Sequence, residues 1–190
     1  MTSEGGGWTM VYKLSSGVAG EPSTLWFGAG ANDGDTTQMS VTPTSAHVVS
    51  RQLARWNTGF TVTQARVVMY QSGREQAFLR FNAIGSDRTN WFALGRVITA
   101  TWTDLASQGQ NFFQIEGHGN YGRHWFINRN YGGCPADTGW LVVNGSTETT
   151  CAWSTRMPYV SIMYALGGVT RNWNDYPNIG VADVMAVFVR

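Results

Sequence analysis

The chain has 190 residues, of which 43% are hydrophobic, a size and composition that predict one compact domain over residues 1–190. Thirteen basic and twelve acidic residues give a net charge of +1, which excludes a strong electrostatic field for nucleic acid or an anionic membrane. No apolar run is long enough to span a bilayer, and membrane insertion is not expected. Residues 1–3 read as an appended start without the pattern of a signal peptide.

Short strands separated by loops are the expected elements, because 23 glycines and 13% aromatic residues are typical of a loop-rich β protein. The first is a half-buried strand in which Trp8, Met10, Tyr12 and Leu14 alternate and should share one face. Ser15 to Pro43 then predicts an ordered loop, with Leu25, Trp26 and Phe27 as its apolar anchor.

One helix is predicted with its N-cap at Ser45 and its end at Trp56, because Ala46, Val49, Leu53 and Trp56 recur at helical spacing. After it, Ala65 to Gln71 and Glu75 to Ala83 predict a hairpin around Ser72-Gly73-Arg74.

The second half of the chain predicts further strands and one long loop. The strands cover Asn111 to Gly117, His124 to Arg129, Trp140 to Val143, Tyr159 to Ala165 and Asp183 to Val189. The closing run Val184 to Val189 is apolar on both faces, which favours a central place in a sheet. Gly168 to Gly180 is the loop most typical of a binding site.

The two cysteines, Cys134 and Cys151, flank one predicted strand and a turn, so they could lie within disulfide distance. A bond across this short loop would contribute about 3 kcal/mol; the alternative is two buried thiols. Asn144-Gly145-Ser146, inside the same loop, is an N-glycosylation sequon and predicts an exposed turn. Together these features favour an oxidising compartment, and we expect a secreted protein.

Three stretches resemble a known family. Gly5-Gly6-Gly7-Trp8-Thr9 is similar to the start of fibrinogen-like C-terminal domains, and the glycine and proline pattern around Cys134 resembles the intelectin (X-type lectin) branch. Val184 to Arg190 is similar to the last intelectin strand. The resemblance implies an α+β fold that is β-rich, with few short helices and long ordered loops. The chain departs from the family in having one candidate disulfide where intelectins have several, and it lacks the acidic calcium segment of typical fibrinogen-like domains.

The resemblance also implies glycan recognition, assisted by calcium and linked to innate immunity. The loop that corresponds to the intelectin sugar site contains Trp173, Asn174, Asp175, Tyr176 and Asn178. Aromatic faces can cover the apolar patches of a sugar while amides and carboxylates bond its hydroxyls. The alternative is that Trp173 packs on the core and Asn174-Asp175 forms the turn before Pro177.

A second candidate site contains His118, Asn120, His124, Asn128 and Asn130, of which His118, His124 and Asn128 are the expected ligand-binding residues. His124, Asn128 and Asn130 share one side of a predicted strand, and His118 lies in the preceding loop. Asp175, Glu116 and His118 are the candidate ligands of a calcium ion, although oxygen ligands are few and zinc lacks a third nitrogen or sulfur. Arg123 and Arg129 could instead hold a carboxylate or sulfate, and the default alternative is that both arginines are solvated.

No catalytic motif marks the chain, so we expect a carbohydrate-binding protein and not an enzyme. The partners predicted are glycans, with homo-oligomerisation as a way to raise avidity. The alternative is an extracellular structural or adhesive module that binds protein. A small aromatic-walled pocket with polar groups would favour the lectin, and a broad exposed apolar patch would favour the adhesive module.

Overall fold

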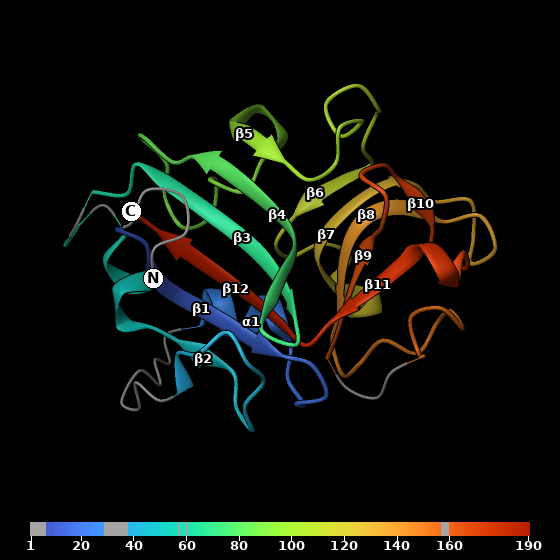
Figure 1. Ribbon diagram of the computed structural model, residues 1–190, viewed down its shortest axis with the longest axis horizontal. Helices are drawn as coiled ribbons and strands as arrows, with labels where there is room; N and C mark the ends of the chain where they lie inside the picture. The colour runs from blue at the N-terminus through green and yellow to red at the C-terminus, as the bar shows by residue number, and fades with distance from the viewer. Residues whose placement is uncertain (1–6, 29–37, 57, 60, 157–159) are drawn as a thin grey trace.

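The computed structural model describes residues 7–28, 38–56, 58–59, 61–156 and 160–190. Within these ranges the chain is rich in strand and has only short helices, and its strands form two antiparallel sheets (Figure 1). The β-rich character predicted from the sequence is therefore confirmed. No helix in the described part of the chain has both the length and the apolar character needed to cross a bilayer.

The first sheet contains strands from both ends of the chain. Their order is β2 (Val48–Val49), β1 (Thr9–Ser15), β12 (Val184–Val189), β3 (Gln64–Gln71), β4 (Arg74–Asn82) and β5 (Val97–Ala100). Because β12 lies between β1 and β3 and is buried along its whole length, the predicted central position of the closing run is confirmed.

The predicted hairpin is formed by β3 and β4. Ser72 and Gly73 connect the two strands and both have positive φ, 51° and 70°, as a two-residue type I′ turn requires. Arg74, which the sequence placed in the turn, is instead the first residue of β4 and pairs with Gln71.

Contrary to the sequence prediction, the apolar side chains at the start of the chain do not all lie on one face of β1. The pairing of β1 with β12 shifts register between Met10 and Tyr12. Trp8 and Met10 pack in a cluster on the outer face of the sheet, whereas Tyr12 and Leu14 belong to the main core. The prediction of a single shared face is wrong because a bulge inverts the order of the faces.

The helix predicted from Ser45 to Trp56 is also wrong. Val48 and Val49 form β2, and only Arg51–Arg55 are helical, as the 3-10 helix η3. Ser50, not Ser45, caps it, with its Oγ accepting from the Gln52 amide at 3.2 Å. β-branched valines favour a strand, and here they pair with β1.

The loop predicted between Ser15 and Pro43 contains a helix, α1 (Pro22–Phe27). Proline near the first helical position is compatible with this start. Trp26 of α1 is fully buried in the main core, so the apolar triplet does anchor the segment.

The second sheet carries the candidate site. Its order is β11 (Ile179–Ala182), β9 (Ser161–Ala165), β8 (Thr138–Asn144), β7 (Arg123–Asn130) and β6 (Phe112–Gln114), with β10 (Arg171–Asn172) also pairing with β8. Three further 3-10 helices are η4 (Leu94–Arg96), η5 (Gly119–Tyr121) and η6 (Tyr176–Asn178). The stretch from Gly168 to Gly180, predicted as loop, thus contains β10, η6 and the start of β11.

Side chains from both sheets form one main core. It joins Val67, Leu79 and Val187 of the first sheet to Leu141 and Ile162 of the second. The core also contains a group of aromatic rings in mutual contact: Tyr12, Trp26, Trp56, Phe81, Trp91, Phe92 and Trp125. The two sheets are therefore held together by burial of large apolar surface.

A smaller cluster covers the outer face of the second sheet. Trp153 and Trp173 stack there with ring centroids 5.6 Å apart, and Phe126, Val142 and Met163 of the sheet lie beneath them. Cys151 belongs to the same cluster. The segments after β8 and around β10 are thus fixed to the sheet, and the candidate site lies beside them.

Candidate functional site

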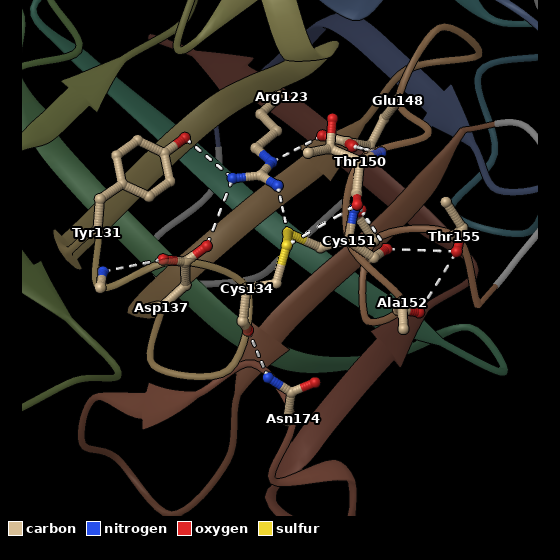
Figure 2. The surroundings of a disulfide bond; sticks show 12 residues. Arg123, Tyr131, Cys134, Asp137, Glu148, Thr150, Cys151, Ala152, Thr155 and Asn174 are labelled. Atoms are coloured by element: carbon tan, nitrogen blue, oxygen red, sulfur yellow. Dashed lines mark hydrogen bonds and ion pairs between the residues drawn. A yellow bond between two sulfur atoms is a disulfide. The ribbon is translucent and has the colours of Figure 1, made fainter.

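The predicted disulfide is present and closes the site on one side. Cys134 and Cys151 are bonded, with their Cα atoms 5.4 Å apart, so the alternative of two buried thiols is wrong. The bond ties the loop between β7 and β8 to the segment that follows β8 (Figure 2). Cys151 is buried, whereas Cys134 is partly exposed.

Arg123, the first residue of β7, is the centre of the site. Its Nε donates to Glu148 at 2.7 Å, Nη1 donates to the Tyr131 hydroxyl at 3.1 Å, and Nη2 lies 3.1 Å from the Cys151 sulfur (Figure 2). Its guanidinium carbon also lies 4.4 Å from the centre of the Trp153 ring. The side chain is only 3% exposed, so these contacts replace water for a buried charge.

Asp137 supplies a second carboxylate to the same cluster. Its Oδ2 lies 3.6 Å from Arg123 Nη1, and its Oδ1 accepts from the Gly132 amide at 3.1 Å. Burial raises the pKa of Asp137, and the nearby Arg123 only partly opposes this shift. Asp137 therefore holds the loop between β7 and β8 against the guanidinium.

Gly122 allows the other carboxylate to reach Arg123. It ends η5 in the left-handed conformation, with φ of 63°, and a Cβ there would lie 2.6 Å from Thr147 Oγ1 and 2.7 Å from the Glu148 amide. Only glycine adopts this conformation at such close approach without cost. The turn before β7 and the turn after β8 consequently pack together, and this contact places Glu148.

A cavity of about 230 Å³ opens above this cluster. Three rings wall it: His118, Tyr121 and Tyr131. The remaining lining residues are Arg123, Gly133, Cys134, Asp137, Thr150 and Cys151. Pockets for drug-sized ligands measure about 300–1,000 Å³, so this cavity suits a smaller ligand.

The rings of the wall are fixed by contacts with one another. His118 stacks on Phe112 at 5.3 Å and meets the edge of Tyr121 at 4.4 Å between centroids. Its Nδ1 lies 2.9 Å from the Tyr131 hydroxyl. Burial, with a contribution from Arg123, lowers the pKa of His118, which favours the neutral imidazole. Tyr121 is 42% exposed and leaves an aromatic surface open at the rim.

His124 and Asn128, the other members of the second predicted cluster, do not line this cavity. Buried His124 has Nε2 at 2.9 Å from Glu21 and Nδ1 at 3.2 Å from the Glu116 carbonyl. Asn128 is fully buried, where it donates to Asn111 and accepts from the Trp173 indole at 3.0 Å. Both side chains have structural partners.

Trp173, predicted as a sugar-stacking residue, is fully buried on the outer face of the second sheet. Gly139 leaves room for it, since a Cβ there would lie 2.6 Å from the indole ring. Trp173 therefore packs against the protein, which is the alternative to sugar stacking that the sequence also allowed.

The other residues of that loop bond mainly to neighbouring parts of the chain. Asn174 donates to the Cys134 carbonyl at 2.6 Å, and Asn178 donates to both carboxylate oxygens of Asp175 at 3.1 and 3.0 Å. Tyr176 is 39% exposed, with the Arg156 guanidinium 4.0 Å from its ring centre. None of these residues lines the cavity at Arg123.

The three candidate metal ligands occupy different places. His118 lines the cavity, Glu116 lies in a separate hollow beside Phe27, and Asp175 is bonded by Asn178. Across the residues that the structure describes, no three histidine, cysteine or acidic side chains form a group able to hold a metal ion. Calcium-assisted binding stays a prediction.

The sequon asparagine lies inside the protein, contrary to the exposed turn predicted for it. Asn144 is 1% exposed and donates to the Ser161 hydroxyl at 3.1 Å. Only Ser146 of the triplet is exposed. The folded chain does not present this amide for modification.

Sequence reasoning missed Tyr121, Tyr131 and Glu148 as site residues. The signal that could have found them is the disulfide, because a bond between Cys134 and Cys151 places both flanking segments beside the start of β7. Arg123 is neither the anion-binding group nor the solvated side chain that the sequence allows, because it is buried and paired with Glu148 and Asp137. No family model, curated protein or solved structure matches this chain.

Proposed function

We propose that this protein binds carbohydrate and does not transform it, and that the cavity walled by His118, Tyr121 and Tyr131 is the binding site. The observation that carries the proposal is one small cavity whose three wall rings also carry polar groups, namely the His118 imidazole and the hydroxyls of Tyr121 and Tyr131. A sugar needs such a combination, because its C–H faces pack on rings while its hydroxyls require hydrogen-bonding groups.

The carboxylates at this site support binding over hydrolysis. Glycosidases place two carboxyl groups on either side of the scissile bond. Asp137 and Glu148 are instead buried against the same guanidinium, with side chains 2% and 0% exposed, and only Asp137 is among the residues that line the cavity. Carboxylates so placed stabilise the cavity and have little access to a ligand.

The adhesive module has less support. Among the described residues, the large hydrophobic side chains that are exposed are Ile84, Ile98, Tyr121 and Tyr176. Of these, Tyr121 belongs to the cavity wall, Ile84 follows β4, Ile98 lies in β5 and Tyr176 lies in η6. A broad apolar docking patch would need more contiguous surface.

The proposal also includes a family and a cellular location for this protein. The β-rich fold and the disulfide are compatible with an extracellular fibrinogen/intelectin-like domain, and the disulfide favours an oxidising compartment. Oligomerisation would raise the avidity of a site that holds one sugar ring.

The experiment compares two exposed tyrosines, one at each candidate site. We expect Tyr121→Ala to weaken binding to a glycan panel about tenfold, the loss of one ring contact, and Tyr176→Ala to leave it unchanged. Each titration is run with calcium and with chelator, and circular dichroism verifies both folds. Loss of binding only in Tyr176→Ala would move the site to the loop at 173–178. If the wild-type protein bound no glycan, the carbohydrate proposal would be wrong and the protein-binding module would replace it.

A further inference from the structure

We infer that the cavity accepts an uncharged sugar ring and rejects sugars that carry a carboxylate or sulfate. This inference rests on the proposed carbohydrate function and names the class of ligand for the same site. The inference follows from the charges of Arg123, Asp137 and Glu148 beneath the cavity and from the hydrogen-bonding groups of the rings that wall it.

The charges beneath the cavity do not favour an anion. One guanidinium, Arg123, faces two carboxylates, Glu148 at 2.7 Å and Asp137 at 3.6 Å. All three side chains are at most 3% exposed, so water screens them poorly. With the three groups ionised, the cluster carries an excess negative charge, which opposes an incoming carboxylate or sulfate.

Arg123 is also poorly placed to bind an anion. Binding a carboxylate through two parallel hydrogen bonds requires two adjacent N–H groups of the guanidinium that the ligand can reach. Nε donates to Glu148, Nη1 to the Tyr131 hydroxyl and Nη2 to the Cys151 sulfur. Each nitrogen therefore already has a partner within the protein, and the side chain is only 3% exposed, so an anion has little access to the remaining N–H groups.

The hydrogen-bond chain from Arg123 instead prepares a donor for a neutral oxygen. Nη1 donates to the Tyr131 oxygen, and the Tyr131 hydroxyl lies 2.9 Å from Nδ1 of His118, where either group can be the donor. Burial raises the pKa of Tyr131 and lowers that of His118, which favours the neutral form of both. In the tautomer in which Tyr131 donates to Nδ1, the imidazole hydrogen is on Nε2, and this N–H can donate to a hydroxyl or ring oxygen.

The test compares neutral methyl glycosides with their uronic acids, which differ only in the C6 carboxylate, by calorimetry on the full chain. We expect the wild-type protein to prefer the neutral member about tenfold or more, the effect of one poorly screened charge. Glu148→Gln keeps the size of the side chain and an acceptor for Arg123 Nε but removes one negative charge. This variant should reduce the preference, and Asp137→Asn provides an independent second variant if Glu148→Gln does not fold.

The outcomes separate the two proposals. Equal wild-type affinity for both members of a pair would overturn the charge selection and leave carbohydrate binding intact. A preference that persists undiminished in a folded variant would show that charge at this cluster is not its cause. Absence of binding to any sugar would overturn the proposed function, and the selectivity would fall with it.

Discussion

The guanidinium of Arg123 contacts groups that lie 8, 25 and 28 residues further along the chain, namely Tyr131, Glu148 and Cys151. Single residues make this convergence possible. Gly122 lets two turns approach, and Asp137 ties the loop between β7 and β8 to the same cation. Removing one member of such a buried cluster leaves an uncompensated charge, which is usually costly.

Gly122→Ala should destabilise the protein by about 2 kcal/mol or more, because the new methyl group meets Thr147 and Glu148 while the backbone keeps an unfavourable φ. Gly119→Ala, three residues earlier in the same turn, is the matched control, since a Cβ there meets nothing within 4 Å. Urea unfolding measures both variants. Equal stability of the two would contradict the packing described for Gly122.

The pKa of Asp137 predicts a pH dependence with a definite sign. Because burial raises this pKa above its usual value of 3.8, the folded protein binds a proton more readily than the unfolded chain. The stabilisation from that proton is present below 3.8 and is lost as the pH rises through the folded-state pKa.

Asp137→Asn is neutral throughout this window and serves as the reference. The free energy of unfolding of the wild-type protein should therefore fall relative to that of the variant as the pH rises. Urea titrations in steps upward from pH 3.8 measure the difference. A difference that moves in the opposite direction would mean that attraction to Arg123 outweighs burial.

At the scale of elements, the disulfide holds one loop and one following segment around the cavity. The strands β7 and β8 enter the site as neighbours in a sheet, but their connecting loop and the segment at 150–156 have no strand pairing of their own. The covalent bond limits the freedom of both in the unfolded chain.

Replacing both Cys134 and Cys151 with serine should lower the free energy of unfolding by about 3 kcal/mol and weaken ligand binding at the cavity that both residues line. Chemical denaturation with and without reductant measures the first effect. Reductant should lower the stability of the wild-type protein but not that of the double variant. A double variant with wild-type stability would mean that the hydrogen bonds around Arg123 hold these segments without the bond.

Elements could be predicted from the sequence where local pattern decides them, and the site could not. The hairpin β3–β4 and the central strand β12 follow from alternation, turn residues and apolar runs. The helix expected at Ser45 failed because pairing of Val48 and Val49 with β1 is a tertiary contact. Of the predicted ligand residues, His118 lies in the cavity, while Trp173 is buried because Gly139, far away in sequence, makes room for its ring.

For the molecule as a whole, the decisive feature is the core shared by the two sheets. Neither sheet could keep its inner apolar face away from water without the other. The sequence predicts one domain over residues 1–190. Because the two sheets share a core, this prediction can be tested by unfolding.

Thermal or urea unfolding should therefore be a single cooperative transition. Far-ultraviolet circular dichroism follows the strands, and near-ultraviolet circular dichroism follows the packed rings. We expect both signals to change together, as for two-state unfolding. Two separated transitions would instead indicate that the sheets belong to independently stable units.

The ring cluster of the core has an optical consequence. Trp26 lies 5.0 Å from Trp125 and 5.6 Å from Trp91, which in turn is 5.6 Å from Trp56. At such separations excitation migrates among indoles before emission, so these four should fluoresce as one coupled chromophore. The cavity is walled by tyrosines and a histidine instead. The emission of these four indoles will consequently report on the integrity of the core, whereas Trp153, whose ring centre lies 4.4 Å from the Arg123 guanidinium carbon, is the indole beside the cavity floor.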